Sequence, residues 1–139
     1  MIEFTVFGPP KGKGRPRFRR TGNFVQTYTD DETLSYEQLV RFSYLQDNNE
    51  KYMDKEPLEM EVTVYQQIPS SFSKKKYKLC EDGELRPTKK PDIDNCVKSI
   101  LDGLNKVAYA DDTQIVSLKC NKYYSSEPRV EVKIKMWEF

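Results

Sequence analysis

Alternating apolar and polar positions predict four short strands along the chain. The clearest run lies at 58–64 (LEMEVTV), where every second residue is apolar and the period of two is typical of a strand with one buried face. A β-branched and aromatic run at 2–7 (IEFTVF), the segment 116–120, and the alternating segment 130–136, which ends at Trp137, are interpreted in the same way. These segments are expected to form one sheet.

A first helix is expected at 29–46. Thr29 and Glu32 have the spacing of a capping box at its start. The positions expected to face inward are Tyr36, Leu39, Val40, and Tyr44 or Leu45.

A second helix starts near Pro91. Its apolar residues fall within an arc of about 100° at helical pitch, which predicts one strongly buried face. These residues are Ile93, Val97, Ile100, Leu101 and Leu104. A further short helix is expected at 70–78, and the glycine- and proline-rich segment GPPKGKGRPR that begins at Gly8 is expected to place the basic cluster of residues 11–20 on a loop.

The resulting order, β-α-β-α-β-β, indicates an α+β fold, with a mixed sheet and helices packed on it. A length of 139 residues is enough for one compact domain, and we assign 1–139 to a single domain. The amino terminus has no signal-peptide pattern, and no run of residues is apolar enough to span a membrane. Three widely spaced cysteines form no disulfide framework, so we expect a reduced, cytoplasmic location.

The chain contains no histidine, which excludes mechanisms that need a histidine base, nucleophile or metal ligand. Carboxylates remain as metal ligands, and hard oxygen ligands suit Mg²⁺, Mn²⁺ or Ca²⁺. The net charge of +1 is an average over opposed blocks. Residues 9–20 carry six bases and no acid, and residues 92–112 carry five acids against two bases. Each block taken alone is typical of solvated surface charge, whereas basic segments beside an acidic cluster suit a metal-dependent enzyme that acts on a polyanion.

The segment 89–115 carries the candidate chemistry. Asp92 and Asp94 stand at a helix start, where aspartate commonly caps the helix and where a pair of carboxylates could instead bind a cation. Lys98 lies between Asp94 and Asp102 at intervals of four residues. This spacing fits an exposed salt-bridge ladder or a cation placed to neutralise a phosphoryl group.

Asp111 and Asp112 precede the third strand, and such a pair is usually part of a turn. It could add a metal ligand if the chain returns toward the start of the helix. Two basic segments, 12–20 and 72–78, mix cations with aromatic residues, which suits contacts with phosphates and bases. The candidate nucleic-acid contacts are Lys11, Lys13, Arg15, Arg17, Arg19, Arg20, Lys74, Lys75 and Lys76.

Taken together, these motifs resemble the RusA family of Holliday-junction resolvases. The matching residues are Pro91-Asp92-Ile93-Asp94-Asn95, Lys98, Leu101-Asp102-Gly103-Leu104 and Asp111-Asp112-Thr113-Gln114-Ile115. The GPPKGKGRPRF opening and the YTDDET helix start are similar to the Gram-positive, prophage-borne branch of that family.

The resemblance implies a Mg²⁺-dependent homodimer, with Mn²⁺ as a substitute cation, that binds four-way DNA junctions and makes paired nicks in recombination and repair. It also implies that Asp92, Asp94 and Asp112 are catalytic metal ligands and that Lys98 is the catalytic lysine, with Asp111 as the alternative third ligand. Two other functions stay open. They are a non-catalytic DNA-binding accessory protein and a metal-dependent nuclease for flaps or single strands.

Overall fold

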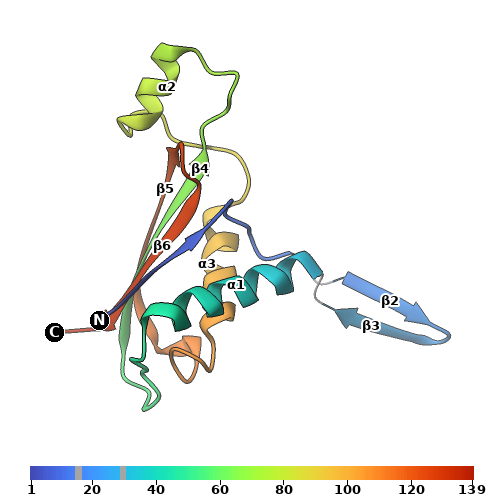
Figure 1. Ribbon diagram of the computed structural model, residues 1–139. Helices are drawn as coiled ribbons and strands as arrows, with labels where there is room; N and C mark the ends of the chain where they lie inside the picture. The colour runs from blue at the N-terminus through green and yellow to red at the C-terminus, as the bar shows by residue number, and fades with distance from the viewer. Residues whose placement is uncertain (15–16, 29–30) are drawn as a thin grey trace.

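The computed structural model describes residues 1–14, 17–28 and 31–139. Its main sheet has four strands in the order β1-β6-β4-β5. Their bounds are β1 (Ile2–Phe7), β4 (Leu58–Gln67), β5 (Ile115–Ser125) and β6 (Arg129–Met136). Strand β6 is antiparallel to both β1 and β4, whereas β5 runs parallel to β4 along the other edge (Figure 1). The predicted mixed sheet and the α+β class are confirmed.

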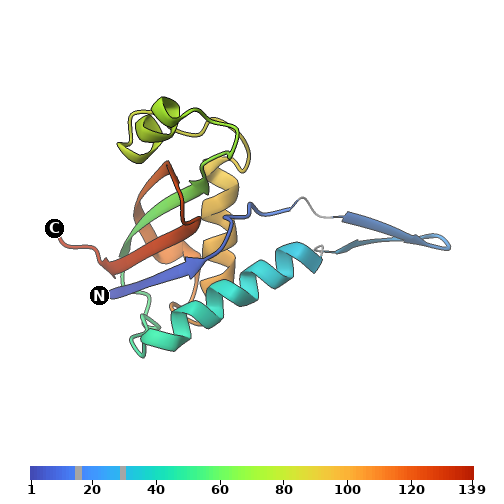
Figure 2. The same cartoon turned by 45° about the horizontal axis from the view of Figure 1, so that its top comes forward.

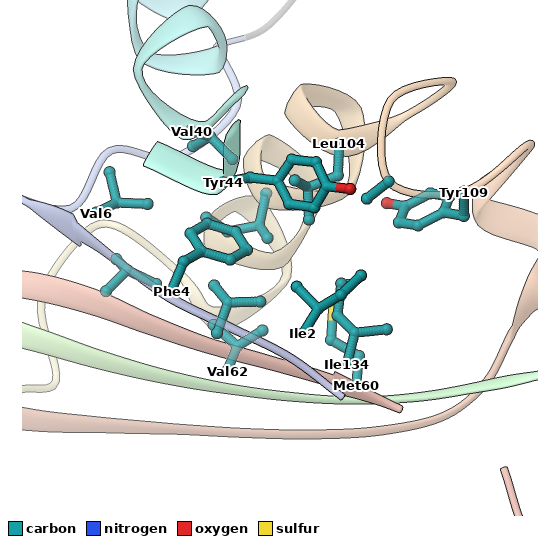
Figure 3. Close-up of a cluster of buried hydrophobic side chains, with 14 of the residues drawn as sticks. Ile2, Phe4, Val6, Val40, Tyr44, Met60, Val62, Leu104, Tyr109 and Ile134 are labelled. Atoms are coloured by element: carbon teal, nitrogen blue, oxygen red, sulfur yellow. The ribbon is translucent and has the colours of Figure 1, made fainter. Parts of the chain in front are cut away.

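Two helices, α1 (Asp31–Asp47) and α3 (Ile93–Leu104), cover one face of this sheet (Figure 2). The core lies between the two layers, where alternate residues of β1, β4 and β6 meet the buried sides of the helices (Figure 3). The helices approach closely at Gly103, where an added Cβ would lie 2.9 Å from the Cβ of Val40. Any larger residue at this position would push α1 and α3 apart.

Each of these two helices buries fewer of its apolar residues than the sequence pattern predicts. In α1, Tyr36, Val40 and Tyr44 are buried as expected, but Leu39 is 40% exposed. Ile93, the first residue of α3, is 44% exposed. The expectations for Leu39 and Ile93 were therefore wrong.

A β-hairpin was not predicted. Strands β2 (Arg17–Thr21) and β3 (Phe24–Tyr28) pair antiparallel as a separate two-stranded sheet. The hairpin projects away from the main sheet and its helices (Figures 1 and 2). The basic segment is thus a loop only in its first part, and the expectation of a loop was wrong for Arg17, Arg19 and Arg20, which belong to β2.

The remaining elements are short. Helix α2 (Lys74–Glu81) follows β4 and begins four residues later than expected, with Ser73 as its N-cap. A single 3-10 turn, η1 (Asp112–Gln114), leads into β5. Thr29, the expected cap of α1, lies outside the described residues. No helix in the described part of the chain has the length and apolar character needed to cross a membrane.

Candidate active site

Asp92 and Asp94 stand at the start of α3, where both are exposed. Asp92 occupies the N-cap position with an extended backbone, but its side chain makes no capping hydrogen bond. Asp94 lies in the first helical turn. The helix dipole favours negative charge at this end, and the exposed positions of both carboxylates leave them accessible to a cation.

A groove of about 760 Å³ opens beside this helix start. One wall is the segment 10–14, and the other includes Lys90, Pro91, Asp92 and Asn95. The segment lies close against α3 because the amide of Lys13 donates to the carbonyl of Asn95 (3.0 Å). The hydroxyl of Ser99 likewise donates to the carbonyl of Lys11 (2.9 Å). The fold therefore places a groove lined by Lys11, Lys13 and Lys90 directly beside Asp92.

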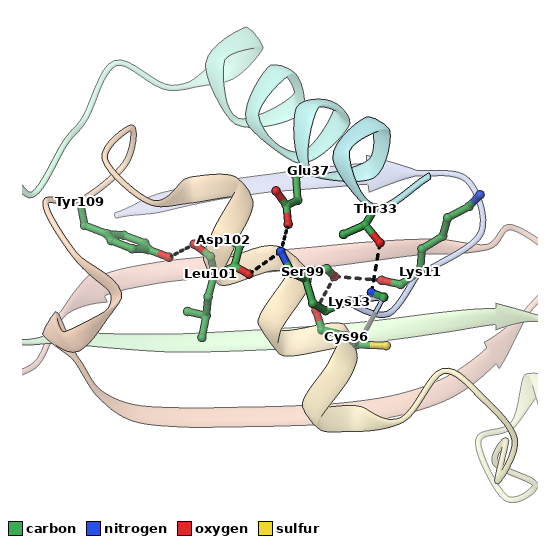
Figure 4. A network of polar contacts seen from close by, with 10 residues as sticks. Lys11, Lys13, Thr33, Glu37, Cys96, Ser99, Leu101, Asp102 and Tyr109 are labelled. Carbon is green, nitrogen blue, oxygen red and sulfur yellow. Dashed lines mark hydrogen bonds and ion pairs between the residues drawn. The ribbon is translucent and has the colours of Figure 1, made fainter. Parts of the chain in front are cut away.

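The loop after α3, which carries the second pair of aspartates, folds back against the last turn of the helix. The hydroxyl of Tyr109, which is fully buried, donates to the carbonyl of Leu101 (2.8 Å; Figure 4). Gln114 closes the next turn, since its side-chain oxygen accepts from the amides of Ala110 and Asp111. This loop is thus held in a fixed position against the end of α3.

The two neighbouring aspartates have different environments. Asp111 caps η1, and its carboxylate accepts a hydrogen bond from the hydroxyl of Thr113 (3.0 Å). Asp112 is half-buried. Its burial, together with the charges of Asp111 and Asp102, raises the pKa of its carboxyl, and the Lys98 cation partly offsets this shift. Asp111 therefore serves the turn, whereas Asp112 lies within the electrostatic reach of Asp102 and Lys98.

Lys98 lies on the same flank of α3 as Asp94 and Asp102, four residues from each of them. At about 1.5 Å of rise per residue, Asp94 and Asp102 are ~12 Å apart along the helix, with Lys98 midway. Asp102 does not pair with Lys98, because its carboxylate binds the ammonium of Lys13 at 3.0 Å (Figure 4). Among the described residues, no acidic side chain forms an ion pair with Lys98.

The donor chemistry of this flank fits a hard divalent cation. Within the described part of the chain, no three acidic or thiol groups lie close enough together to enclose a metal ion. Mg²⁺ seldom uses such a cage, since it typically binds one or two carboxylates together with water and substrate phosphates. The thiol of Cys96 is unsuited as a ligand, because burial raises its pKa to about 12. Carboxylates are therefore the available ligands.

The predicted DNA contacts fall into different environments. Lys11 pairs with Glu32 at 2.5 Å, whereas the side chain of Lys13 is 20% exposed and its ammonium binds acidic side chains of α1 and α3. Arg20 and the α2 lysines (Lys74, Lys75 and Lys76) are exposed, and Lys76 also lies over the Phe72 ring. Arg15 lies outside the described residues, as do the side chains of Arg17 and Arg19.

Sequence reasoning missed three features of the site. The hairpin could have been recognised from its Gly22-Asn23 turn between two short runs of strand-forming residues. Lys90 lines the groove next to Asp92, although it belonged to a lysine-rich stretch with no assigned role. The pairing of Lys13 with Asp102 had no signal in the sequence, because 88 intervening residues separate them.

Comparison with known proteins decides the family. The family model described as "Endodeoxyribonuclease RusA" matches residues 8–135. The chain belongs to the RusA endodeoxyribonuclease family. A relative from Bacillus subtilis (strain 168), the "Uncharacterized protein YqaN", is 43% identical over 136 residues, which cover 96% of this chain and 95% of that protein.

Membership in the RusA family supports a nuclease that hydrolyses phosphodiester bonds in DNA. The matched range includes the groove, the hairpin, the flank of α3 and the return loop. The residues that first suggested the resemblance therefore lie within the part of the chain that defines the family.

Proposed function

We propose that this RusA-family protein is a Mg²⁺-dependent endodeoxyribonuclease that resolves four-way DNA junctions. The observation that carries the proposal is the arrangement along one flank of α3. There, two exposed carboxylates begin the helix, and Lys98 follows without an ion-pair partner among the described residues. Asp112, on the loop after the helix, interacts electrostatically with Lys98 and Asp102. The lysine-lined groove opens at the first of these carboxylates.

Asp92, Asp94 and Asp112 are the proposed ligands of Mg²⁺, or of Mn²⁺ in its place. The chemistry supplied by such a cation is acidification of the attacking water and stabilisation of the charge on the leaving 3′ oxygen. The raised pKa of Asp112 supports this assignment, because a nearby cation relieves the repulsion among the carboxylates. The capping role of Asp111 favours Asp112 as the third ligand.

Lys98 is proposed to neutralise charge on the phosphoryl group as it develops in the transition state. Its ammonium can approach a phosphate because no acidic partner among the described residues holds it. Preorganised cations of this kind stabilise transition states effectively, since they need no reorganisation during the reaction. With no histidine in the chain, a carboxylate is the remaining side chain suited to accept the proton of the attacking water.

The projecting hairpin and α2 are proposed to bind the arms of the junction. A two-stranded ribbon has dimensions that fit the major groove of DNA, and β2 contributes Arg17, Arg19 and Arg20 without any acidic residue in either strand. The exposed α2 lysines provide a second basic surface. Since a four-way junction has two-fold character, we propose a homodimer in which each subunit makes one nick.

Asp94→Asn tests this proposal. The substitution removes one ligand charge at an exposed position, so folding and junction binding are expected to persist while cleavage is lost. Junction binding is measured by mobility shift without Mg²⁺, and cleavage is measured with Mg²⁺ on a labelled four-way junction. Wild-type turnover by this variant would exclude the proposed metal site. Cleavage of flaps or single strands in preference to junctions, by the unaltered protein, would assign a different nuclease activity.

A further inference from the structure

Lys13 belongs to the basic segment but lies among acidic side chains. Its ammonium binds Glu37 of α1 at 2.6 Å and Asp102 of α3 at 3.0 Å (Figure 4). The side chains of all three residues are largely buried, with exposures of 20% for Lys13, 14% for Glu37 and 27% for Asp102. With two carboxylates already bound to it, this ammonium is poorly placed to contact a DNA phosphate.

The ion pair with Lys13 determines which cation the Asp102 carboxylate binds. Asp102 follows Lys98 by four residues on the same helix, a spacing at which opposite charges ordinarily attract each other. In the structure the Asp102 carboxylate turns instead to Lys13, and Lys98 has no ion pair within the described residues. Lys13 therefore competes with Lys98 for the same carboxylate.

We propose that Lys13 is a positioning residue that holds Asp102 away from Lys98. The proposal rests on the proposed function of Lys98 and replaces the earlier expectation that Lys13 contacts DNA. Loss of the Lys13 charge leaves Asp102 without a partner, and the nearest cation on its own helix is then Lys98. Once paired, Lys98 is drawn back from the phosphate, so that kcat falls while DNA affinity is retained.

The test compares wild type with Lys13→Met, the double variant Lys13→Met/Asp102→Asn, and a control, Lys133→Met. Lys133 is an exposed lysine of β6 that pairs with Glu3 at 3.8 Å, so the control also removes one lysine from an ion pair. The first readout is the rate at which an amine-reactive acetylating reagent modifies Lys98 in the folded protein, measured by mass spectrometry. The second readout is junction cleavage, resolved into kcat, KM and the dependence of binding on salt.

We expect Lys13→Met to slow modification of Lys98 by about twofold, the population ratio of a typical i,i+4 helix pair. The kcat should fall by a similar factor, with KM and the salt slope unchanged. Removing the Asp102 charge in the double variant should restore both the modification rate and kcat, which loss of a mere structural contact would not allow. The control should behave as wild type.

Three results would overturn the proposal. The first is an unchanged rate of Lys98 modification in Lys13→Met, and the second is failure of the double variant to recover. The third is a rise in KM with a salt slope smaller by about 0.9, which is the signature of a lost phosphate contact. If Lys13→Met does not fold, Lys13→Gln carries the same expectations. Absence of cleavage by wild type would refute the proposed function, whereas the modification rates still test the role of Lys13.

Discussion

Gly12 is the position at which a single methyl group should alter the groove beside Asp92. A Cβ at this position would lie 2.9 Å from the Cβ of Asn95 and 3.1 Å from that of Pro91. The backbone of Gly12 has no positive φ, so the expected defect of Gly12→Ala is steric. To make room, the segment 8–14 must move away from α3.

The expected cost follows from these contacts. Overpacking of a filled site costs about 1–3 kcal/mol, and the smaller conformational entropy of alanine in the unfolded chain offsets about 0.4–1 kcal/mol of this. The net loss of stability is therefore about 1–2 kcal/mol, or about 3–10 °C in melting temperature for a chain of this size. The hydrogen bonds that join Lys13 to Asn95 and Ser99 to Lys11 should weaken, and the groove should widen.

Thermal melting and junction cleavage measure the two effects separately. Gly83→Ala is a matched control, because Gly83 has a φ of +78° in a loop after α2, and the strain of alanine there costs about 1–2 kcal/mol. Both variants should melt earlier than wild type, but only Gly12→Ala should lose cleavage at a temperature where all three proteins are folded. A Gly12→Ala protein with wild-type melting and cleavage would show that the close approach to α3 is unimportant.

Two further predictions concern the charges of the protein. Replacing the three β2 arginines with glutamine should reduce the salt slope of junction binding by about 0.9 for each lost phosphate contact, whereas the same change at Lys133 and Lys135 should leave it unaltered. The raised pKa of Asp112 means that its ionised form destabilises the metal-free fold, and that this cost disappears as the pH falls through that pKa. Asp112→Asn should therefore raise the metal-free melting temperature at neutral pH and lose this gain in acid; an equal gain at both pH values would contradict the assignment.

The main sheet could be predicted from sequence because its strands bury one face. In β4, Leu58, Met60, Val62 and Val64 are all fully buried, and a period of two leaves little choice of orientation. Helix α1 was harder to orient because apolar residues occur on both of its sides. Leu39 and Leu45 are exposed, whereas Val40 is buried, and packing against α3 and β1 determines which side faces the core.

The chemistry of the site could be predicted more fully than its geometry. The aspartates at the start of α3 and the lysine one turn later follow from local spacing on a single helix. The path of the return loop depends on the hydrogen bond from Gln114 to the carbonyl of Tyr52, which lies 62 residues earlier in the sequence. Long-range ion pairs such as Lys13 with Asp102 depend on the complete fold and leave no local pattern.

We propose that this chain cuts four-way DNA junctions through carboxylate-bound Mg²⁺. The most direct test incubates the purified protein with a four-way junction labelled on each strand, with Mg²⁺ or with a chelator, and sizes the products on a sequencing gel. We predict paired nicks at symmetric positions in opposite strands with Mg²⁺ and intact strands with the chelator. Nicks that persist in the chelator, or no cleavage of a bound junction with Mg²⁺ or Mn²⁺, would contradict the claim.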